Sequence, residues 1–432
     1  MSKSGWKYYK IKEIGRVVTG KTPPTKESKY FGKDKLFIRI PDMGRNVRVK
    51  ESEMMLSDEG FEYLRSCSLP RGAVMISCIA TVGKVGITDQ ECCTNQQINS
   101  VIPDTDLAIP EWIYYYLKNN TDYLESLGGG GSVYTNISKS RFEESQIEIP
   151  PLPEQRAIAH ILGTLDDKIE LNRKMNETLE AMARAIFKSW FIDFDPVHAK
   201  AQGRDPKLPK EISDLFPSEF QNSELGKIPK NWKVIKLQDI NIFVVDNRGK
   251  TPPIVKHNKN VIPLVEVNAI AGSNRTIDLH QCKKFVNQET YNNWFRKGHP
   301  KPGDVLISTV GSIGQLAQVF DEQICIAQNI VALRTEGSNR YLYDLLKSIQ
   351  QNIVSLDISS VQPSIKVPHL LSIKIISPTH RIIEHFEKET ISIVSKIRYN
   401  ASQSLDLASI RDTLLPKLLS GEIRVKDAEK HI

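Results

Sequence analysis

Basic and amide side chains recur in two separate stretches of the chain, in segments that read as loops. Arginine and lysine can neutralise phosphates or read guanine, and asparagine and glutamine can read adenine. The residue types therefore predict contact with DNA. The candidates in the first stretch are Lys21, Thr22, Arg39, Arg45, Arg48, Lys84, Asn136, Lys139 and Arg141. Those in the second stretch are Arg248, Lys250, Thr251, Lys256, Arg275, Arg296, Lys297, Gln362 and Lys366.

Any one of these side chains taken alone is more often a solvated surface charge than a DNA contact. Lys21 and Lys250 stand out because each lies in a Gly-Lys-Thr-Pro-Pro block, and this block occurs twice. The same block could also recur only because it builds the same turn. The prediction of DNA binding thus depends on the whole set.

Sequence motifs of the common enzyme classes are missing. The chain has no Gly-x-x-x-x-Gly-Lys-[Ser/Thr] loop, no Gly-x-Gly-x-x-Gly loop and no Gly-x-Ser-x-Gly elbow. Its nine histidines and six cysteines show no spacing typical of a metal site. We therefore expect no catalytic residue, no metal site and no cofactor in this chain.

The bulk composition indicates a globular protein of ordinary character. A length of 432 residues with 40% hydrophobic side chains predicts two or three domains. A net charge of +7 and a pI near 8.9 permit nucleic-acid binding without requiring it. We read no signal peptide and no membrane span, and the cysteine pattern indicates buried reduced thiols. We expect a cytoplasmic protein.

The chain contains one plan twice. Five short blocks recur in the same order at a nearly constant offset, which predicts two similar domains. The matched blocks are residues 5–7 with 231–233, 20–24 with 249–253, 70–77 with 301–308, 81–86 with 309–314, and 96–98 with 328–330. Short apolar strands alternate with helical segments in each copy, so both copies read as mixed α/β domains.

Two long helical segments must position these domains. The first follows a proline-rich entrance at Pro150 and runs to Phe191, a span of roughly 50 Å at about 1.5 Å per residue. The second has Ser377 as N-cap and Pro378 as first residue, and ends near Gly421 after a kink at Pro416. Apolar residues recur at three-four spacing in both, which favours an antiparallel coiled coil over two separate surface helices. The seam of the first helix consists of Ile158, Ile161, Leu165, Met175, Leu179, Met182 and Ile186, interrupted by Lys168 and Asn172.

The predicted organisation has six parts. A first globular domain spans residues 1–150, and a long helix spans 151–195. A linker with little regular structure occupies 196–228, because prolines are frequent there. A second domain spans 229–376, a second long helix spans 377–424, and a tail spans 425–432. The fold class is therefore mixed α/β, with two similar globules and two long antiparallel helices.

The sequences of the two helices resemble a known family. The stretch Pro-Pro-Leu-Pro-Glu-Gln-Arg-Ala-Ile-Ala at 150–159, followed by residues 165–172 and 179–187, is similar to the specificity subunit of type I restriction-modification enzymes. So is Leu-Leu-Pro-Lys-Leu-Leu-Ser-Gly-Glu-Ile at 414–423. The resemblance covers nearly the whole chain. The second helix departs from the family pattern at its entrance, where Ser-Pro-Thr-His-Arg stands at 377–381.

The resemblance implies a non-catalytic subunit whose two target recognition domains each read one half of a split DNA site, with the helices as spacer. It also implies two methyltransferase subunits that use S-adenosylmethionine, and two motor-nuclease subunits that use ATP and Mg²⁺. The partner-binding candidates on the first helix are Arg156, Glu170, Arg173, Lys174 and Glu177. Two rival hypotheses are a protein–protein scaffold that binds no nucleic acid and a nuclease with an unrecognised site.

Overall fold

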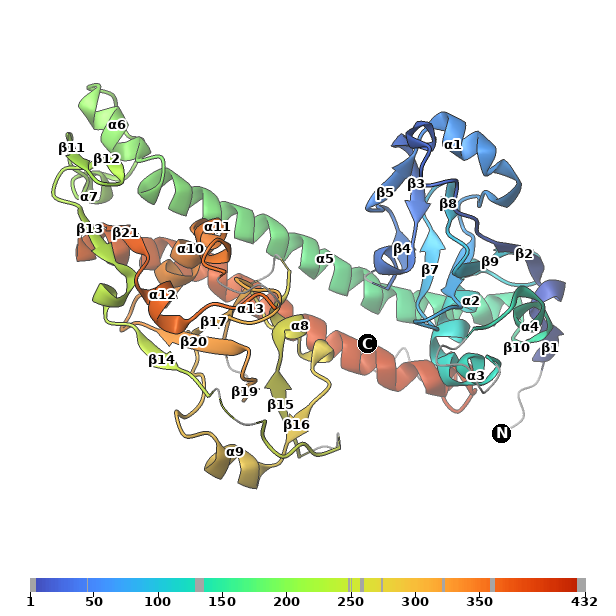
Figure 1. Ribbon diagram of the computed structural model, residues 1–432. Coiled ribbons are helices and arrows are strands. Elements are labelled where there is room, and N and C mark those ends of the chain that lie inside the picture. Colours follow the sequence, from blue (N-terminus) through green and yellow to red (C-terminus); the bar gives the residue numbers. More distant parts are fainter. Residues whose placement is uncertain are drawn as a thin grey trace. The chain divides into compact units, whose positions relative to one another are not determined.

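The computed structural model describes residues 5–44, 46–128, 136–247, 249, 251–256, 260–272, 275–320, 323–357 and 362–425 (Figure 1). The chain divides into two compact units. Unit 1 comprises Met1–Leu171 with Gln403–Ile432, and unit 2 comprises Asn172–Ser402. Three predicted DNA-binding residues, Arg45, Arg248 and Lys250, lie outside the described residues.

Unit 1 is built on two small sheets. The first has the order β2 (Gly15–Thr19), β9 (Ile98–Pro103), β6 (Val74–Ser77), β7 (Val85–Thr88) and β4 (Arg48–Val49). The second has the order β5 (Met54–Leu56), β3 (Phe31–Ile38) and β8 (Cys92–Thr94), with β3 parallel to β8. A separate pair joins β1 (Lys7–Lys10) to β10 (Gln146–Ile149). The helices are α1 (Asp58–Tyr63), α2 (Pro110–Asn119), α3 (Thr121–Ser126) and α4 (Lys139–Glu144), with 3-10 turns η1 (Ile11–Glu13), η2 (Ser28–Tyr30), η3 (Ile40–Asp42) and η4 (Arg65–Cys67).

The strand β6 lies between the two hydrophobic cores of unit 1. Val74 and Ile76 belong to the core that contains α2, whereas Met75 belongs to the core under β3 and β8. Successive side chains of a strand point to opposite faces, so an uninterrupted apolar strand can serve two cores. This explains why the strand is apolar at every position except its last.

Unit 2 repeats this framework. Its larger sheet has the order β14 (Phe243–Val245), β20 (Ile330–Arg334), β17 (Val305–Ser308) and β18 (Leu316–Gln318). Its smaller sheet has the order β16 (Phe285–Val286), β15 (Ile262–Val265) and β19 (Cys325–Ile326), with β15 parallel to β19. The pair β13 (Lys233–Lys236) and β21 (Lys374–Ser377) corresponds to β1 and β10. The shared strand order confirms the predicted internal repeat. The remaining elements are α8 (Val267–Ile270), α9 (Gln288–Trp294), α10 (Asn339–Ser348), α11 (Gln350–Val354), α12 (Val367–Leu371), η5 (Leu237–Ile240) and η6 (Leu279–Gln281).

One of the five sequence matches is wrong by three residues. The structure aligns β6 with β17 and β7 with β18 without a gap, because Ile76 pairs with Val85 just as Ile307 pairs with Leu316. Gly83 (φ 88°) therefore corresponds to Gly314 (φ 76°) and not to Gly311. Gly311 (φ 81°) corresponds to Ala80 (φ 66°), which adopts the same left-handed conformation with a side chain. The backbone shape recurs here although the residue type does not.

Two helices of 40 residues each, α5 (Leu152–Phe191) and α13 (His380–Leu419), contribute to both units. Within unit 1, Asp166 of α5 pairs with Arg411 of α13 at 2.6 Å. Within unit 2, Asn176 Nδ2 donates to the carbonyl oxygen of Ile397 at 3.1 Å, and Phe187 lies against Phe386. Residue numbers rise along α5 as they fall along α13, so the predicted antiparallel pairing is confirmed.

Details of the helix prediction need correction. Met182 is half exposed, and Ala183, which is completely buried, takes its place in the seam. The second helix begins at His380, because Ser377 still belongs to β21. It continues through Pro416 to Leu419.

The prediction that residues 196–228 form a linker with little regular structure is wrong. It contains α6 (Asp195–Ala201), α7 (Lys210–Ser213) and the hairpin of β11 (Phe220–Ser223) with β12 (Gly226–Pro229). Pro196 lies in the first turn of α6 and Pro209 is the N-cap of α7, positions where a missing N–H breaks no hydrogen bond of the helix. Val197, Ile212 and Phe216 are buried in the core of unit 2, which orders the segment.

The six cysteines are free and buried. Burial raises the pKa of Cys78 to about 11 and that of Cys93 to about 12, so both stay protonated thiols near neutral pH. Of the helices in the described part of the chain, none combines the length and the apolar character that crossing a membrane requires.

Candidate nucleic-acid interface

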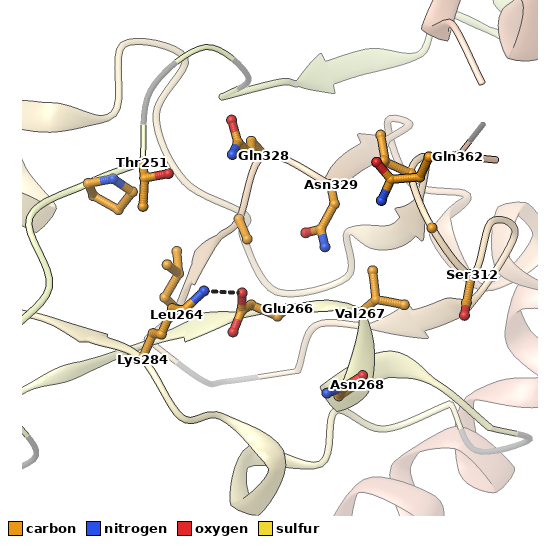
Figure 2. Close-up of a pocket in the computed structure, with 14 residues that line it drawn as sticks. Thr251, Leu264, Glu266, Val267, Asn268, Lys284, Ser312, Gln328, Asn329 and Gln362 are labelled. Atoms are coloured by element: carbon orange, nitrogen blue, oxygen red, sulfur yellow. Dashed lines mark hydrogen bonds and ion pairs between the residues drawn. The ribbon is translucent and has the colours of Figure 1, made fainter. Parts of the chain in front are cut away.

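A cleft of about 580 Å³ lies in unit 2, and three of the repeated sequence blocks line it (Figure 2). Thr251 and Pro252 come from the Gly-Lys-Thr-Pro-Pro block, and Gly311 comes from the β17–β18 loop. Gln328 comes from the block 328–330, which is matched with 96–98. The other residues that line it are Leu264, Glu266, Val267, Asn268, Lys284, Val310, Ser312, Ala327, Asn329 and Gln362. Sequence blocks that are far apart therefore converge on one site.

Backbone hydrogen bonds hold the walls of the cleft together. The N–H of Thr309 donates to the carbonyl oxygen of Asn329 at 2.8 Å, and the N–H of Gly311 donates to that of Pro363 at 2.9 Å. On the opposite wall, the Glu266 carboxylate accepts a hydrogen bond from Lys284 Nζ at 2.7 Å. The cleft thus presents amide, carboxylate and ammonium groups, which are the groups that read base edges.

The corresponding region of unit 1 has the same backbone pattern. The N–H of Cys78 donates to the carbonyl oxygen of Gln97 at 2.8 Å, as Thr309 does to Asn329 in unit 2. Lys21 N–H donates to the carbonyl oxygen of Thr94 at 2.9 Å, and Thr22 Oγ1 donates to Gln96 Oε1 at 2.5 Å. The first Gly-Lys-Thr-Pro-Pro block therefore lies beside the Gln96 block, as the second does in unit 2.

The surroundings of Gly20 explain why the first Gly-Lys-Thr-Pro-Pro block begins with glycine. A Cβ at this position would lie 2.2 Å from Thr94 Oγ1 and 2.3 Å from the carbonyl oxygen of Asn95. The close approach of the two segments therefore excludes a side chain there. Gly249 has open space around it and a φ of +137°, so the second block needs glycine for its backbone conformation instead.

Most of the predicted DNA-binding residues are at the surface. The exposed ones are Lys21, Asn136, Lys139, Arg141, Thr251, Lys256, Arg296, Lys297, Gln362 and Lys366. Thr22, Arg39, Arg48 and Lys84 are half-buried. Several of the basic groups already have a protein partner: Arg39 pairs with Glu53, Arg48 with Glu111 and Lys139 with Glu143. Those pairs leave further N–H donors on each cation.

The prediction that Arg275 contacts DNA is wrong. Its side chain is completely buried, its Nε lies 3.0 Å from Glu180 and its Nη2 lies 2.9 Å from Asp344. The guanidinium also lies over the Tyr343 ring, at 3.9 Å from the centroid. Arg275 therefore joins the β-sheet domain to helix α5 within unit 2, and it has no surface from which to contact DNA.

Sequence reasoning missed several residues that line the cleft. Gln328 and Asn329 carry a sequence signal, because their block recurs at residues 96–97, but the recurrence alone does not separate a binding role from a structural one. Glu266 and Asn268 carried no signal, since a single carboxylate or amide in a polar segment has many explanations. Only the chain path, which brings β15 beside the Gln328 turn, reveals them.

Two further sets of residues were predicted from the sequence, metal ligands (none) and partner contacts on the first long helix. Across the ranges that the structure describes, no group of three or more His, Cys, Asp or Glu side chains is placed to hold a metal ion. The five predicted partner-binding residues lie on α5: Arg156, Lys174 and Glu177 are exposed, and Glu170 and Arg173 are half-buried. Arg173 and Glu177 form an ion pair along the helix.

Comparison with known proteins gives a consistent result. Residues 3–181 and 229–400 match the family described as type I restriction modification DNA specificity domain. The type I restriction enzyme MjaIX specificity subunit of Methanocaldococcus jannaschii is 28% identical, over 98% of this chain and 94% of the relative. The HindI specificity subunit of Haemophilus influenzae is also 28% identical, over 74% of this chain and 79% of the relative. A solved S subunit of a type I restriction-modification system from M. genitalium is similar in fold, with a TM-score of 0.53 and 16% identity over 96% of both chains.

Proposed function

This chain belongs to the type I restriction modification DNA specificity family, and from that premise we propose that it recognises a split DNA sequence, with one half read by each unit. The observation that carries the proposal is the repeated framework. The order β14-β20-β17-β18 in unit 2 matches β2-β9-β6-β7 in unit 1, corresponding loops share hydrogen bonds, and the residues at the site differ between the units. Equal frameworks with different recognition groups suit a target with two different halves.

The contacts divide by chemistry into two classes. The exposed cations, such as Lys21, Lys256 and Lys366, are suited to phosphates, which set the position of the protein on the duplex. The amide and carboxylate groups of the cleft are suited to base edges, which carry the sequence information. The affinity of this chain for DNA should therefore fall as salt concentration rises, whereas its sequence preference should depend on the cleft.

The proposal includes partners that perform the chemistry. In it, this chain supplies no catalytic group and holds two methyltransferase subunits, which bind S-adenosylmethionine and methylate adenine. Two motor-nuclease subunits that use ATP and Mg²⁺ complete the complex. The exposed side chains Arg156, Lys174 and Glu177 of α5 are the proposed contact with the methyltransferase subunits, because charged residues on the outer face of paired helices can set the choice of partner.

Methylation mapping tests this function directly. The chain is co-expressed with the methyltransferase subunit of its system in a host without adenine methylation, and the genome is read by long-read sequencing. Two short specified halves around a fixed unspecified gap are the expected result. A continuous motif would contradict reading by two units. The absence of new methylation, with both proteins soluble and associated, would favour the protein–protein scaffold.

A further inference from the structure

Arg39 in unit 1 and Glu266 in unit 2 occupy the same position of the repeated framework. Each follows directly on the strand that is parallel to β8 or β19. The preceding carbonyl oxygen accepts a hydrogen bond from Asn95 N–H at 3.2 Å in unit 1 and from Ala327 N–H at 2.9 Å in unit 2. Each residue then caps a short helical turn, with φ and ψ of −120° and 168° for Arg39 and −110° and 171° for Glu266. The backbone therefore sets both side chains in equivalent places.

The charge at this position is opposite in the two units. Arg39 pairs with Glu53, and Glu266 pairs with Lys284 at 2.7 Å, so both members of the ion pair change sign. The side chains of Arg39 and Glu266 are 28% and 30% exposed. Ion pairs this accessible to water contribute little to stability, so folding does not require a cation at this position in unit 1 or an anion in unit 2. Binding to two different ligand groups, one in each unit, would account for the two opposite charges.

The surroundings of Glu266 indicate what kind of ligand it meets. It lies in the wall of the cleft with Asn268, Gln328 and Asn329 nearby (Figure 2). An ionised carboxylate repels the phosphates of DNA and can only accept hydrogen bonds, so the DNA groups that suit it are hydrogen-bond donors. The exocyclic amino group of cytosine is such a donor, whereas the O6 and N7 atoms of guanine are acceptors suited to arginine.

We propose that Arg39 and Glu266 are specificity-determining residues at matched positions, Arg39 reading a guanine in one half-site and Glu266 reading a cytosine in the other. This proposal rests on the proposed function. Lys284 holds the Glu266 carboxylate in place and offsets part of its charge, and Glu53 does the same for the Arg39 guanidinium. Each half-site therefore contains a G·C pair whose recognition depends on one of these two side chains.

The test substitutes Glu266→Gln and, separately, Arg39→Gln in the complex with the methyltransferase subunit. Glu336→Gln is the matched control, because Glu336 is an exposed carboxylate of unit 2 that does not line the cleft. The mapped target and duplexes with one base pair exchanged at a time are compared in binding assays. Glu266→Gln should reduce discrimination about 5- to 150-fold at a single G·C pair, the worth of one good base contact. Discrimination in the other half-site should remain unchanged.

Four results would be decisive. Loss of discrimination at one G·C pair by Glu266→Gln, and at one pair of the other half by Arg39→Gln, supports the proposal. Unchanged discrimination at every pair for both variants overturns it while the split target, and hence the proposed function, stands. Equal loss at all pairs of one half also overturns it, because that pattern indicates a collapsed cleft. A wild-type complex without a split target would instead remove the function on which the proposal rests.

Discussion

Arg275 carries its charge where water does not reach, so its two acidic partners depend on it. Replacing Arg275 with Met leaves Glu180 and Asp344 buried without their cation. Breaking a buried ion pair in this way costs about 3–5 kcal/mol of the free energy of unfolding. We expect Arg275→Met to lose this amount in urea-induced unfolding at pH 7.

The pH dependence of this loss identifies its cause. Burial already raises the pKa of Asp344 in the folded protein, and removing the arginine takes away a charge that opposes this shift. The folded variant should bind protons more readily than its unfolded chain, so its deficit grows as pH rises from 5 to 8. Arg296→Met, at an exposed arginine of the same unit, should change stability by less than about 0.5 kcal/mol. A pH-independent deficit would contradict the explanation.

His299 makes the stability of unit 2 sensitive to mild acid. Its ring is stacked on Tyr291 with centroids 3.6 Å apart, and burial lowers its pKa below the ordinary value of 6.5. The unfolded chain therefore takes up a proton first as pH falls, and stability that is fully present above pH 6.5 is lost below it. His299→Gln should show a smaller decrease in melting temperature between pH 7.5 and pH 5 than the wild type. His280→Gln, at an exposed histidine, should keep the wild-type decrease.

The limits of sequence reasoning at this scale are visible in three residues. Lys21 is a candidate DNA contact because its block recurs, and the structure leaves it exposed beside the Gln96 turn. The burial of Arg275 could not be predicted, because residue type gives the charge and not the burial. The structural match of Glu266 with Arg39 could not be predicted either, because the two residues share no sequence signal.

At the scale of elements, two buried asparagines meet where α5 and α13 pair. Asn172 and Asn400 are each 1% exposed, and Asn172 Nδ2 lies 3.3 Å from the carbonyl oxygen of Asn400. Asn400 Nδ2 donates in turn to Asn176 Oδ1 at 2.9 Å. Polar residues in a coiled-coil seam fix the register and reduce stability. The two asparagines therefore specify how the helices align.

The double variant Asn172→Leu with Asn400→Leu separates these effects. We expect its midpoint of urea unfolding to rise by an amount equivalent to about 1–2 kcal/mol, because apolar side chains replace buried amides. Methylation mapping should at the same time show a second gap length, since leucines fit more than one register. Thr178→Leu adds a leucine on an exposed position of α5 and should do neither. A double variant less stable than the wild type would contradict the prediction.

Periodicity predicted these helices well and the segment between them poorly. Both 40-residue helices follow from three-four spacing. A helix with 3.6 residues per turn drifts relative to a strict seven-residue repeat, so the buried seam position is Ala183 instead of Met182. The segment 196–228 was predicted as irregular because of its prolines. Its short helices are ordered by Val197 and Phe216, which pack in a core that proline counting does not reveal.

At the scale of the whole molecule, a net charge of +7 is too small to identify a DNA-binding protein, so the placement of the charges must carry the prediction. If each unit contacts its own half-site, a charge reversal in one unit should affect the DNA backbone on one side only. Lys21→Glu tests unit 1 and Lys366→Glu tests unit 2, both at exposed lysines. Lys227→Glu, at an exposed lysine of β12, changes the net charge equally and is the control.

Hydroxyl-radical footprinting of the complex on its mapped target distinguishes the halves. Lys21→Glu should reduce protection of the deoxyribose backbone in one half-site and Lys366→Glu in the other, while Lys227→Glu leaves both intact. Each of the two variants should also lower the magnitude of the slope of log K against log salt concentration by about one, because one phosphate contact is lost. The base preference should not change. Equal loss of protection in both halves with Lys21→Glu would mean that unit 1 does not read a half-site of its own. In that case the two units would be similar in structure but would not each read a separate half of the target.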